Sequence, residues 1–323
     1  MGKKILVTGA SGFIGTNLLE DLIHKEYEVL NIDFNQPKIT ERKSVWNKVD
    51  ITDFESFKEA VLSFQPDYII HLAARTDLDG KTVDDYSSNT IGVENLLKIV
   101  EELSNLKKII ITSSKFVCPN GYTPKDQFDY CPHTVYGESK VITEKKVWAN
   151  KPHCDWCIIR PTSIWGPWFD VPYRNFFDVV MKRMYFHFGK KPCYKTYGFV
   201  GNSIYQIEQL LLNETSDINN KIFYIGDTPA YNITEWADEI AGELGFKIPK
   251  IPFWFIKSVA KFGDFMKIFG IHFPMTSFRL HNMTTDDINN ISSTVKIAPK
   301  VQYSRIDAVK ITLEWISKYG GKS

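Results

Sequence analysis

The stretch Thr8-Gly9-Ala10-Ser11-Gly12-Phe13-Ile14-Gly15 follows a short apolar segment, residues 4–8, and opens an amphipathic one, residues 15–25. This order predicts a strand, a glycine-rich turn and a helix, the context in which such a turn binds phosphate. Gly9 would permit the tight turn, Gly12 the close approach of the backbone to a pyrophosphate, and Gly15 close packing of the helix on the strand. The spacing differs from G-x-G-x-x-G, and a turn that serves packing alone is the alternative.

Outward from this turn, short β-branched runs alternate with longer amphipathic segments. The alternation is typical of a parallel sheet with crossover helices, and the near-continuous apolar strands indicate burial on both faces. We therefore predict an α/β fold with a doubly wound parallel sheet of about seven strands. The predicted strands are residues 4–8, 28–33, 68–72, 108–112, 156–160 and 221–225. The predicted helices are residues 15–25, 53–64, 90–104, 136–149, 203–212, 232–244 and 305–318.

The alternation weakens after Pro161, where prolines and aromatic residues become frequent. A chain of 323 residues also exceeds what one hydrophobic core usually serves. We predict a dinucleotide-binding domain over residues 1–162, with a later contribution from about 200–226, and a smaller C-terminal substrate domain, mainly residues 163–323. The substrate should bind between them, outside the carboxyl ends of the strands.

The composition excludes several classes of protein. Hydrophobic residues make up 43% and charged residues 24% of the chain, as in globular rather than disordered proteins. With 39 Lys plus Arg against 38 Asp plus Glu, the net charge is +1, so we expect neither nucleic acid nor a membrane as a partner. No signal peptide is expected, because the first strand begins at Lys4. The five irregularly spaced cysteines are expected to be reduced thiols of a cytoplasmic protein, and no metal site is expected.

The segment of residues 251–275 is rich in Phe, Ile and Trp. Four charged residues interrupt it before the roughly 20 apolar residues that a membrane span requires. Its apolar residues recur at helical spacing, and we expect them to face the core. The alternatives are that they line the mouth of the substrate site or contact a membrane surface.

Asp33 ends the second predicted strand, 18 residues after Gly15. A carboxylate there can accept hydrogen bonds from the adenosine ribose hydroxyls and would repel a 2′-phosphate. Asp33 therefore favours NAD over NADP. The alternative is that it only caps the following turn.

Tyr136 and Lys140 are four residues apart, which places both side chains on one face of a helix. A phenol has an ordinary pKa of about 10, and the Lys140 ammonium together with a positive nicotinamide ring would move the pKa of Tyr136 toward neutrality. Tyr136 could then exchange a proton with a hydroxyl or carbonyl of a substrate. Thr112-Ser113-Ser114 ends the preceding strand and could present a hydroxyl to the same oxygen.

These features together resemble the extended short-chain dehydrogenase/reductase family, the group of NAD-dependent nucleotide-sugar epimerases, dehydratases and 4-keto reductases. The resemblance covers nearly the whole chain. Beyond the stretches already quoted, it rests on Asp50-Ile51, His71-Leu72-Ala73-Ala74, the run from Asn89 to Leu96, Arg160-Pro161, Gly166-Pro167 and the run from Pro299 to Trp315.

The resemblance implies a role for each matched residue. It makes Tyr136 the acid or base, Ser114 its hydroxyl partner and Lys140 the activator. The implied NAD-binding residues are Gly9, Ser11, Gly12, Phe13, Ile14, Gly15, Asp33, Asp50, Ile51, Leu72, Ala73, Ala74, Arg75, Asn89, Thr112, Tyr136, Lys140 and Pro161. The candidate substrate-binding residues are Thr76, Ser113, Ser114, Lys115, His133, Ser163, Arg174 and Arg279.

Departures from the family pattern bear on the substrate. Lys115-Phe116 stands where dehydratases of this family have Asp-Glu, which argues against a 4,6-dehydratase. Ser163 replaces an Asn that contacts the sugar diphosphate, and the diphosphate arginine is missing from the run 197–204. Phosphate would then be met by other basic residues. The candidates are Arg174, Lys182, Arg183, Lys195 and Arg279.

The resemblance implies hydride transfer at a carbinol or ketone carbon of a nucleotide-diphosphate sugar, as in a 4-epimerase or 4-ketoreductase of surface-polysaccharide synthesis. Tightly held NAD would give epimerisation, and exchanging NAD would give net oxidation or reduction. The alternatives are a hydroxysteroid-like dehydrogenase of the same fold and a non-enzymatic NAD-binding regulator. The resemblance also implies a homodimer formed by a four-helix bundle of residues 84–103 and 136–149.

Overall fold

The computed structural model describes residues 2–171, 173–188, 191–271 and 275–320. Its centre is a seven-stranded sheet in the order β10-β6-β5-β4-β1-β2-β3, and every pair of neighbouring strands is parallel. The strands are β1 Lys4–Thr8, β2 Glu28–Asp33, β3 Trp46–Lys48, β4 Tyr68–His71, β5 Lys108–Thr112, β6 Asp155–Pro161 and β10 Lys221–Ile225. The doubly wound parallel fold predicted from the sequence is confirmed.

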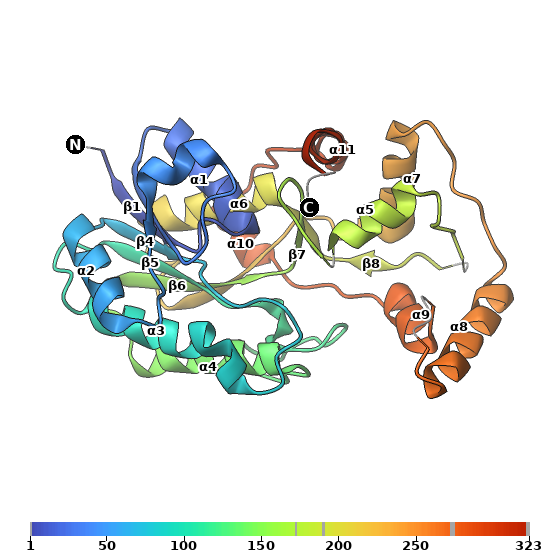
Figure 1. Ribbon diagram of the computed structural model, residues 1–323, viewed down its shortest axis with the longest axis horizontal. Coiled ribbons are helices and arrows are strands. Elements are labelled where there is room, and N and C mark those ends of the chain that lie inside the picture. Colours follow the sequence, from blue (N-terminus) through green and yellow to red (C-terminus); the bar gives the residue numbers. More distant parts are fainter. Residues whose placement is uncertain (1, 172, 189–190, 272–274, 321–323) are drawn as a thin grey trace.

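Helices cover both faces of this sheet (Figure 1). One face is covered by α1 (Phe13–His24) and α6 (Val200–Leu212), and the other by α2 (Phe54–Phe64), α3 (Ser87–Val100) and α4 (Val135–Ala149). Since both faces are covered, the strands contain β-branched residues that are completely buried, such as Ile109, Ile110 and Ile111. The predicted helix at 90–104 begins earlier, at Ser87, after a 3-10 turn, Val83–Tyr86.

The strand order reverses at β1. From β1 the chain first adds β2 and β3 on one side, and then adds β4, β5, β6 and β10 on the other side. Ligands of open parallel sheets bind outside the carboxyl ends of the strands at such a reversal. The glycine stretch follows β1 directly, so the fold places it at this point.

Two short sheets and several helices make up the rest of the chain. β7 (Ser163–Trp165) pairs with β9 (Tyr197–Phe199), and β8 (Tyr194–Lys195) with β11 (Tyr231–Asn232). An aromatic cluster of Trp165, Phe177 and Trp236 joins β7 to α5 and α7. The remaining elements are the 3-10 turns Thr40–Val45 and Lys115–Val117, and α5 (Tyr173–Met181), α7 (Ile233–Glu243), α8 (Phe253–Ile268), α9 (Ser277–Thr284), α10 (Ser292–Ile297) and α11 (Arg305–Tyr319).

Helices α8 and α9 lie together at the end of the molecule farthest from α2 (Figure 1). Only one face of α8 is buried, through Ile256 and Ala260, which pack with Leu280 of α9. The expectation that the apolar residues of 251–275 face the core is wrong for most of them: Trp254 is 69% exposed and Ile268 is 79% exposed. Residues 272–274 of that segment lie outside the described residues. Among the described residues, no helix is long and apolar enough to cross a membrane.

Candidate active site

The glycine stretch after β1 forms a closely packed loop. Gly9 has a positive φ of 76°, and a Cβ there would lie 2.6 Å from the backbone N of Ala73. A Cβ at Gly15 would lie 2.3 Å from the carbonyl O of Gly9, whereas one at Gly12 would meet only that same oxygen, at 3.2 Å. Gly9 and Gly15 are thus required for packing, and the backbone at Gly12 is open to a ligand.

The first turn of α1 begins at this loop, and within the described residues no side chain caps it. Backbone N–H groups at a helix N-terminus, together with the helix dipole, favour an anion such as a pyrophosphate. The open backbone at Gly12 and the uncapped turn after it therefore fit the pyrophosphate of a dinucleotide.

Asp33 ends β2 beside this loop. Its carboxylate accepts hydrogen bonds from the backbone N of Ser11, at 2.9 Å, and of Asn35, at 2.8 Å. Burial raises the pKa of Asp33, and these two bonds oppose the rise. The bond from Asn35 is the turn cap considered above, but the bond from Ser11 also ties the carboxylate to the phosphate loop. Asp33 can cap the turn and also accept hydrogen bonds from the ribose hydroxyls of a bound dinucleotide, because a carboxylate accepts several hydrogen bonds.

Tyr136, Lys140 and Ser114 are all buried at the carboxyl edge of the sheet. Thr134 caps α4 by accepting a hydrogen bond from the backbone N of Gly137, and a Cβ at Gly137 would lie 2.2 Å from the carbonyl O of Phe116. This close packing holds the first turn of α4 against the loop that carries Ser114. The structure therefore brings the three predicted catalytic residues together.

Burial dominates the protonation of this group. It raises the pKa of Tyr136 to about 12, and the Ser114 hydroxyl counteracts part of the rise. Burial also lowers the pKa of Lys140 to about 8, and its Nζ donates to the carbonyl O of Thr112 at 3.0 Å. The expected lowering of the Tyr136 pKa is thus not achieved by Lys140 alone. A further positive charge beside the phenol would be needed, which is what an oxidised nicotinamide ring carries.

Two predicted ligand-binding residues have structural partners instead. The side-chain amide of Asn89 donates to the carbonyl O of Arg75 and to Ser139 Oγ, and its oxygen accepts from the backbone N of Arg75. Asn89 therefore positions the loop after β4 from within α3. The buried Ser113 hydroxyl donates to Glu144 Oε1 at 2.5 Å and does not reach the cleft.

Thr112, at the end of β5, differs from its neighbour Ser113. Its Oγ1 is buried and has no hydrogen-bond partner among the described residues. A buried polar atom without a partner costs free energy, so this hydroxyl is a candidate for contact with a bound ligand.

Lys115 is buried and forms an ion pair with Asp287, which lies 172 residues later in the chain. Asp287 also accepts from the backbone N of Gly121 at 3.0 Å. This pair joins the loop after β5 to the C-terminal part across the cleft. Because the carboxylate already neutralises Lys115, Lys115 contributes less to binding an anion than the sequence suggests.

The other predicted substrate-binding residues are scattered. The His133 ring packs on Phe116 with ring centroids 5.6 Å apart, next to Tyr136, while Thr76 is exposed on the loop after β4. Ser163 is buried on β7, and Arg279 lies in the first turn of α9. Arg174 points elsewhere, since its guanidinium donates to the carbonyl O of Gly320 at 2.9 Å and to Asp178.

Sequence reasoning missed a buried network beneath the site. Arg160 Nε and Nη2 donate to the two carboxylate oxygens of Glu144, at 2.8 and 2.7 Å, and Tyr130 donates to the same carboxylate at 2.9 Å. Glu144 lies four residues after Lys140 on the same face of α4, and this spacing was a usable signal for it. No local signal marks Asp287, because only the fold brings it to Lys115.

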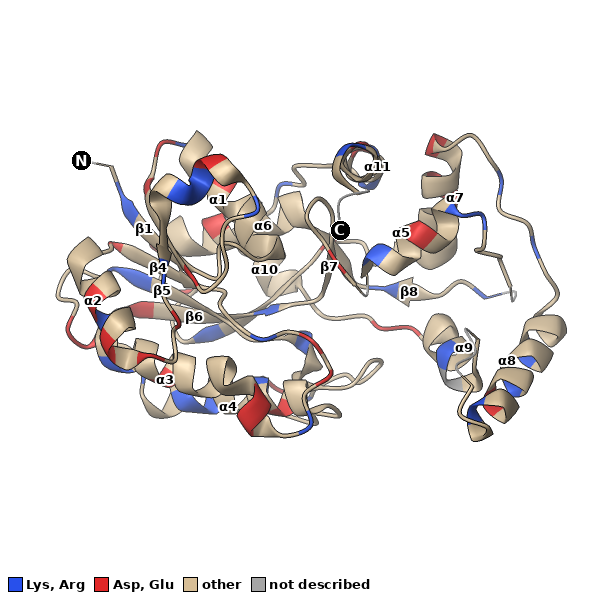
Figure 2. Cartoon of the chain, in the orientation of Figure 1, with Lys and Arg blue, Asp and Glu red and all other residues tan. Residues whose placement is uncertain are grey.

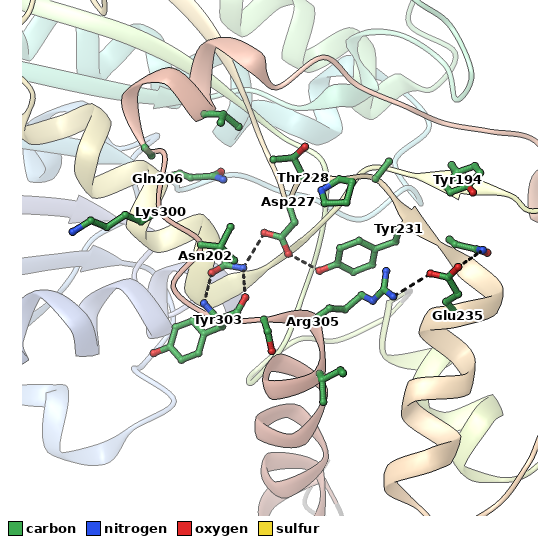
Figure 3. Close-up of a pocket in the computed structure, with 18 of the residues that line it drawn as sticks. Tyr194, Asn202, Gln206, Asp227, Thr228, Tyr231, Glu235, Lys300, Tyr303 and Arg305 are labelled. Atoms are coloured by element: carbon green, nitrogen blue, oxygen red, sulfur yellow. Dashed lines mark hydrogen bonds and ion pairs between the residues drawn. The ribbon is translucent and has the colours of Figure 1, made fainter.

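A cavity of about 560 Å³ lies elsewhere, between α6, α7 and the segment leading into α11 (Figure 3). Its charged groups are largely paired: Tyr231 donates to Asp227 at 2.5 Å, and Arg305 donates to Glu239 at 2.6 Å. Burial raises the pKa of Asp227 to about 6. Ser114, Tyr136 and Lys140, the predicted catalytic residues, are not among the residues that line this cavity.

Comparison with known proteins agrees with this geometry. Residues 5–195, more than half of the chain, match the model of the NAD dependent epimerase/dehydratase family. The chain belongs to this family. The resemblance predicted from the sequence is therefore confirmed, and the protein is an NAD-dependent enzyme.

Two relatives show how this family varies. The chain is 28% identical to N-acetyl-alpha-D-glucosaminyl-diphospho-ditrans,octacis-undecaprenol 4-epimerase of Escherichia coli O157:H7, over 98% of this chain and 100% of the relative. It is also 28% identical to a 3-beta-hydroxysteroid dehydrogenase of Mycolicibacterium neoaurum, over 77% of this chain and 72% of the relative. Among solved structures, UDP-glucose 4-epimerase of Thermotoga maritima with UDP-glucose is similar in fold, with a TM-score of 0.72, 20% identity and coverage of 98% and 99%.

Proposed function

We propose that this protein is a 4-epimerase that inverts a secondary carbinol of a sugar carried on a diphosphate. The observation that carries the proposal is the buried group of Ser114, Tyr136 and Lys140, placed beside the NAD loop at the carboxyl edge of the sheet. The full-length similarity to the E. coli sugar-diphosphate epimerase supports it. The nucleotide-diphosphate sugar expected from the sequence is one member of this substrate class.

Each residue of the group has a defined task. Tyr136 takes the proton from the sugar hydroxyl and later returns it, while Ser114 holds the same oxygen by a hydrogen bond. Lys140 lies one helical turn after Tyr136 on α4 and is anchored to the end of β5, because its Nζ donates to the carbonyl O of Thr112. Bound NAD supplies a reversible hydride acceptor, and Asp33 with the backbone at Gly12 would hold it.

The substrate contacts follow from position. We assign Thr76, Lys115, His133 and Ser163 to the sugar side of the cleft, and Arg279 to the diphosphate. Ser113 and Arg174 are omitted, because their polar groups bind Glu144 and the α11 region.

The test begins with the purified protein and native mass spectrometry, which should show NAD retained on the chain. Incubation with a UDP-linked or polyprenyl-diphosphate-linked N-acetylglucosamine should then give the C4 epimer without net NADH formation. In deuterated water the product should carry no deuterium at C4, because the hydride returns from the cofactor. Failure to bind NAD, or lasting absorbance of NADH with one product, contradicts the proposal.

A second candidate is a hydroxysteroid-type dehydrogenase, which the M. neoaurum relative favours. In that enzyme the cofactor would exchange, and NADH would accumulate in proportion to substrate. Incubation with a 3β-hydroxysteroid and NAD, followed at the NADH absorbance, separates the two functions. The epimerase proposal requires that no NADH accumulates.

We propose a cytoplasmic homodimer in which the α3 and α4 regions of two copies form a four-helix bundle, and a division of the chain near residue 162. Synthesis of a surface-polysaccharide precursor is the proposed role.

A further inference from the structure

The outer face of α8 is apolar and faces solvent. Trp254, Phe265 and Phe269 are separated by 11 and 4 residues, so they lie along one side of this helix and its end. All three are more than half exposed, as is Ile268. The opposite face, with Ile256 and Ala260, packs on α9. A helix on the surface of a globular protein normally exposes its polar side. Helix α8 instead has apolar residues on its exposed side as well as on its buried side.

Lysines flank this surface. Lys257 and Lys261 are one turn apart on α8, on the same side of the helix as Trp254 and Phe265. Figure 2 shows these blue segments along α8 at the far end of the molecule. The one acidic residue of the helix, Asp264, accepts a hydrogen bond from the backbone N of Ser277 and is thereby used in joining α8 to α9. The surface is therefore basic as well as aromatic, although the whole chain has a net charge of only +1.

The α8–α9 unit is connected to β8 and to the residue before it. Lys195 Nζ donates to the carbonyl O of Asn282 in α9, at 2.9 Å, and Cys193 Sγ donates to the carbonyl O of Thr285, at 3.3 Å. Two residues further on, Asp287 pairs with Lys115 beside the catalytic group. The α8–α9 unit is thus linked by hydrogen bonds and by the following chain to Asp287, the partner of Lys115.

We propose that the outer face of α8 is a docking surface for an anionic phospholipid membrane, from which the enzyme takes a sugar carried on a lipid diphosphate. The inference rests on the proposed function, because it names the carrier of the same sugar. We define the membrane-docking face as Trp254, Lys257, Lys261, Phe265, Ile268 and Phe269. It replaces the expectation from net charge that no membrane is a partner.

The chemistry of the face selects this occupant. Aromatic rings and aliphatic chains partition into the boundary between headgroups and acyl chains, and lysines at the same level bind anionic headgroups. A second copy of the chain would bring lysines against lysines, which is unfavourable. A polyprenyl tail also stays in the bilayer, so an enzyme that acts on its headgroup must bind at the membrane surface. The E. coli relative is an epimerase named for a substrate of that kind.

The test uses the full chain with NAD and vesicles of equal parts phosphatidylcholine and phosphatidylglycerol. In flotation, the protein should rise with these vesicles, bind far less to pure phosphatidylcholine, and lose binding as salt is raised. The variant Trp254→Ser/Phe265→Ser/Phe269→Ser should bind at least about tenfold more weakly. The matched control Leu244→Ser/Val301→Ser/Ile306→Ser removes three exposed apolar side chains elsewhere and should float like the unaltered protein. Retained NAD and an unchanged thermal midpoint show that each variant is folded.

Three outcomes overturn the inference. They are no flotation of the unaltered protein, equal flotation of the two triple variants, and loss of self-association rather than of vesicle binding in the α8 variant. The proposed function is judged separately. Epimerisation of a UDP-sugar in solution without vesicle binding would sustain the function and overturn the docking face. Vesicle binding without epimerisation of either substrate would overturn the proposed function and sustain the docking face.

Discussion

Helices α4 and α8 have nearly the same length, 15 and 16 residues, but distribute their side chains in opposite ways. In α4, polar and ionisable residues are buried: Tyr136, Lys140 and Glu144. In α8, large apolar residues such as Trp254 and Phe269 are exposed. Apolar residues usually lie inside a protein and charged residues outside. Helix α4 departs from this rule through its buried ionisable residues, and α8 departs from it through its exposed apolar residues.

The buried charges of α4 and the exposed apolar face of α8 each need a partner that stabilises them. A buried charge is stable only when it is paired or hydrogen-bonded, and Glu144 accepts four hydrogen bonds, from Arg160 twice, Ser113 and Tyr130. The outer face of α8 is exposed in the part of the chain that the structure describes, and the partner proposed for it is a membrane. In α4 the compensation is internal, and in α8 it comes from outside. Four predictions test this contrast.

The largest effect is expected at Tyr136. Tyr136→Phe keeps the ring and its contacts with Tyr86 and Phe116 but removes the hydroxyl that handles the proton. We expect kcat to fall by about 10²–10⁴-fold, with NAD binding and the thermal midpoint unchanged. Steady-state kinetics and NAD titration provide the measurements. Tyr205→Phe, on α6, serves as the control and should keep full activity, and a similar loss in both variants would contradict the assignment.

The buried network of α4 gives the next effect. Arg160→Met leaves the Glu144 carboxylate buried without its main partner, so the free energy of unfolding should fall by about 3–5 kcal/mol. Arg305 makes the same two-pronged contact with Glu239, but this pair is partly exposed. Arg305→Met should cost only about 1 kcal/mol. Urea denaturation of both variants compares them directly, and equal costs would show that burial does not govern the stability of the α4 network.

Lys140 connects stability to pH. Burial lowers the pKa of Lys140 to about 8 in the folded state, whereas the unfolded chain has about 10.5. Between these values the unfolded state binds more protons, so the contribution of Lys140 to stability improves as pH rises through this window. Lys140→Met removes the cost of burying a charged ammonium at every pH. The unfolding free energy that this variant gains over the unaltered protein should therefore shrink by roughly 3 kcal/mol from pH 7 to pH 11.

The measurement is the difference in unfolding free energy between Lys140→Met and the unaltered protein across that range. Taking the difference cancels the other titrating groups. A difference that stays constant with pH would mean that Lys140 is not desolvated in the folded protein.

The smallest effect is expected on the outer face of α8. Trp254→Ser, Phe265→Ser and Phe269→Ser should each change the unfolding free energy by no more than about 0.5 kcal/mol, because exposed side chains contribute little to the core. Ile256→Ser, on the buried face, should open the α8–α9 unit and speed its cleavage by trypsin at Lys257 and Lys261. Limited proteolysis distinguishes the two faces. Equal cleavage of all variants would mean that the outer face is also packed within the fold.

Much of the fold could be predicted because its signals are local. β2, β5 and β10 begin and end where the sequence predicts, since β-branched runs between turn residues determine them. β3 was not predicted, because three residues carry too little pattern, and it forms by pairing with β2. Helices α3 and α6 begin three residues earlier than predicted, at Ser87 and Val200, since their first turns are stabilised by tertiary contacts.

The site divides in the same way. Gly9, Gly15, Tyr136 and Lys140 stand in short motifs with fixed spacing, so their roles follow from neighbours in the sequence. Asn89 and Ser113 also stand in motifs, but their polar atoms are used inside the protein, a choice that depends on distant residues.

The sequence specifies six strands of the sheet, the glycine turn and the shared helix face of Tyr136 and Lys140, because each depends on periodicity or on spacing along one element. Only the tertiary structure decided that Lys115 pairs with Asp287, that Glu144 and Arg160 support α4, and that the apolar face of α8 is exposed. The physical reason is that burial and ion pairing depend on which surfaces the folded chain brings together. An amphipathic pattern specifies a helix and its faces, but not what each face meets.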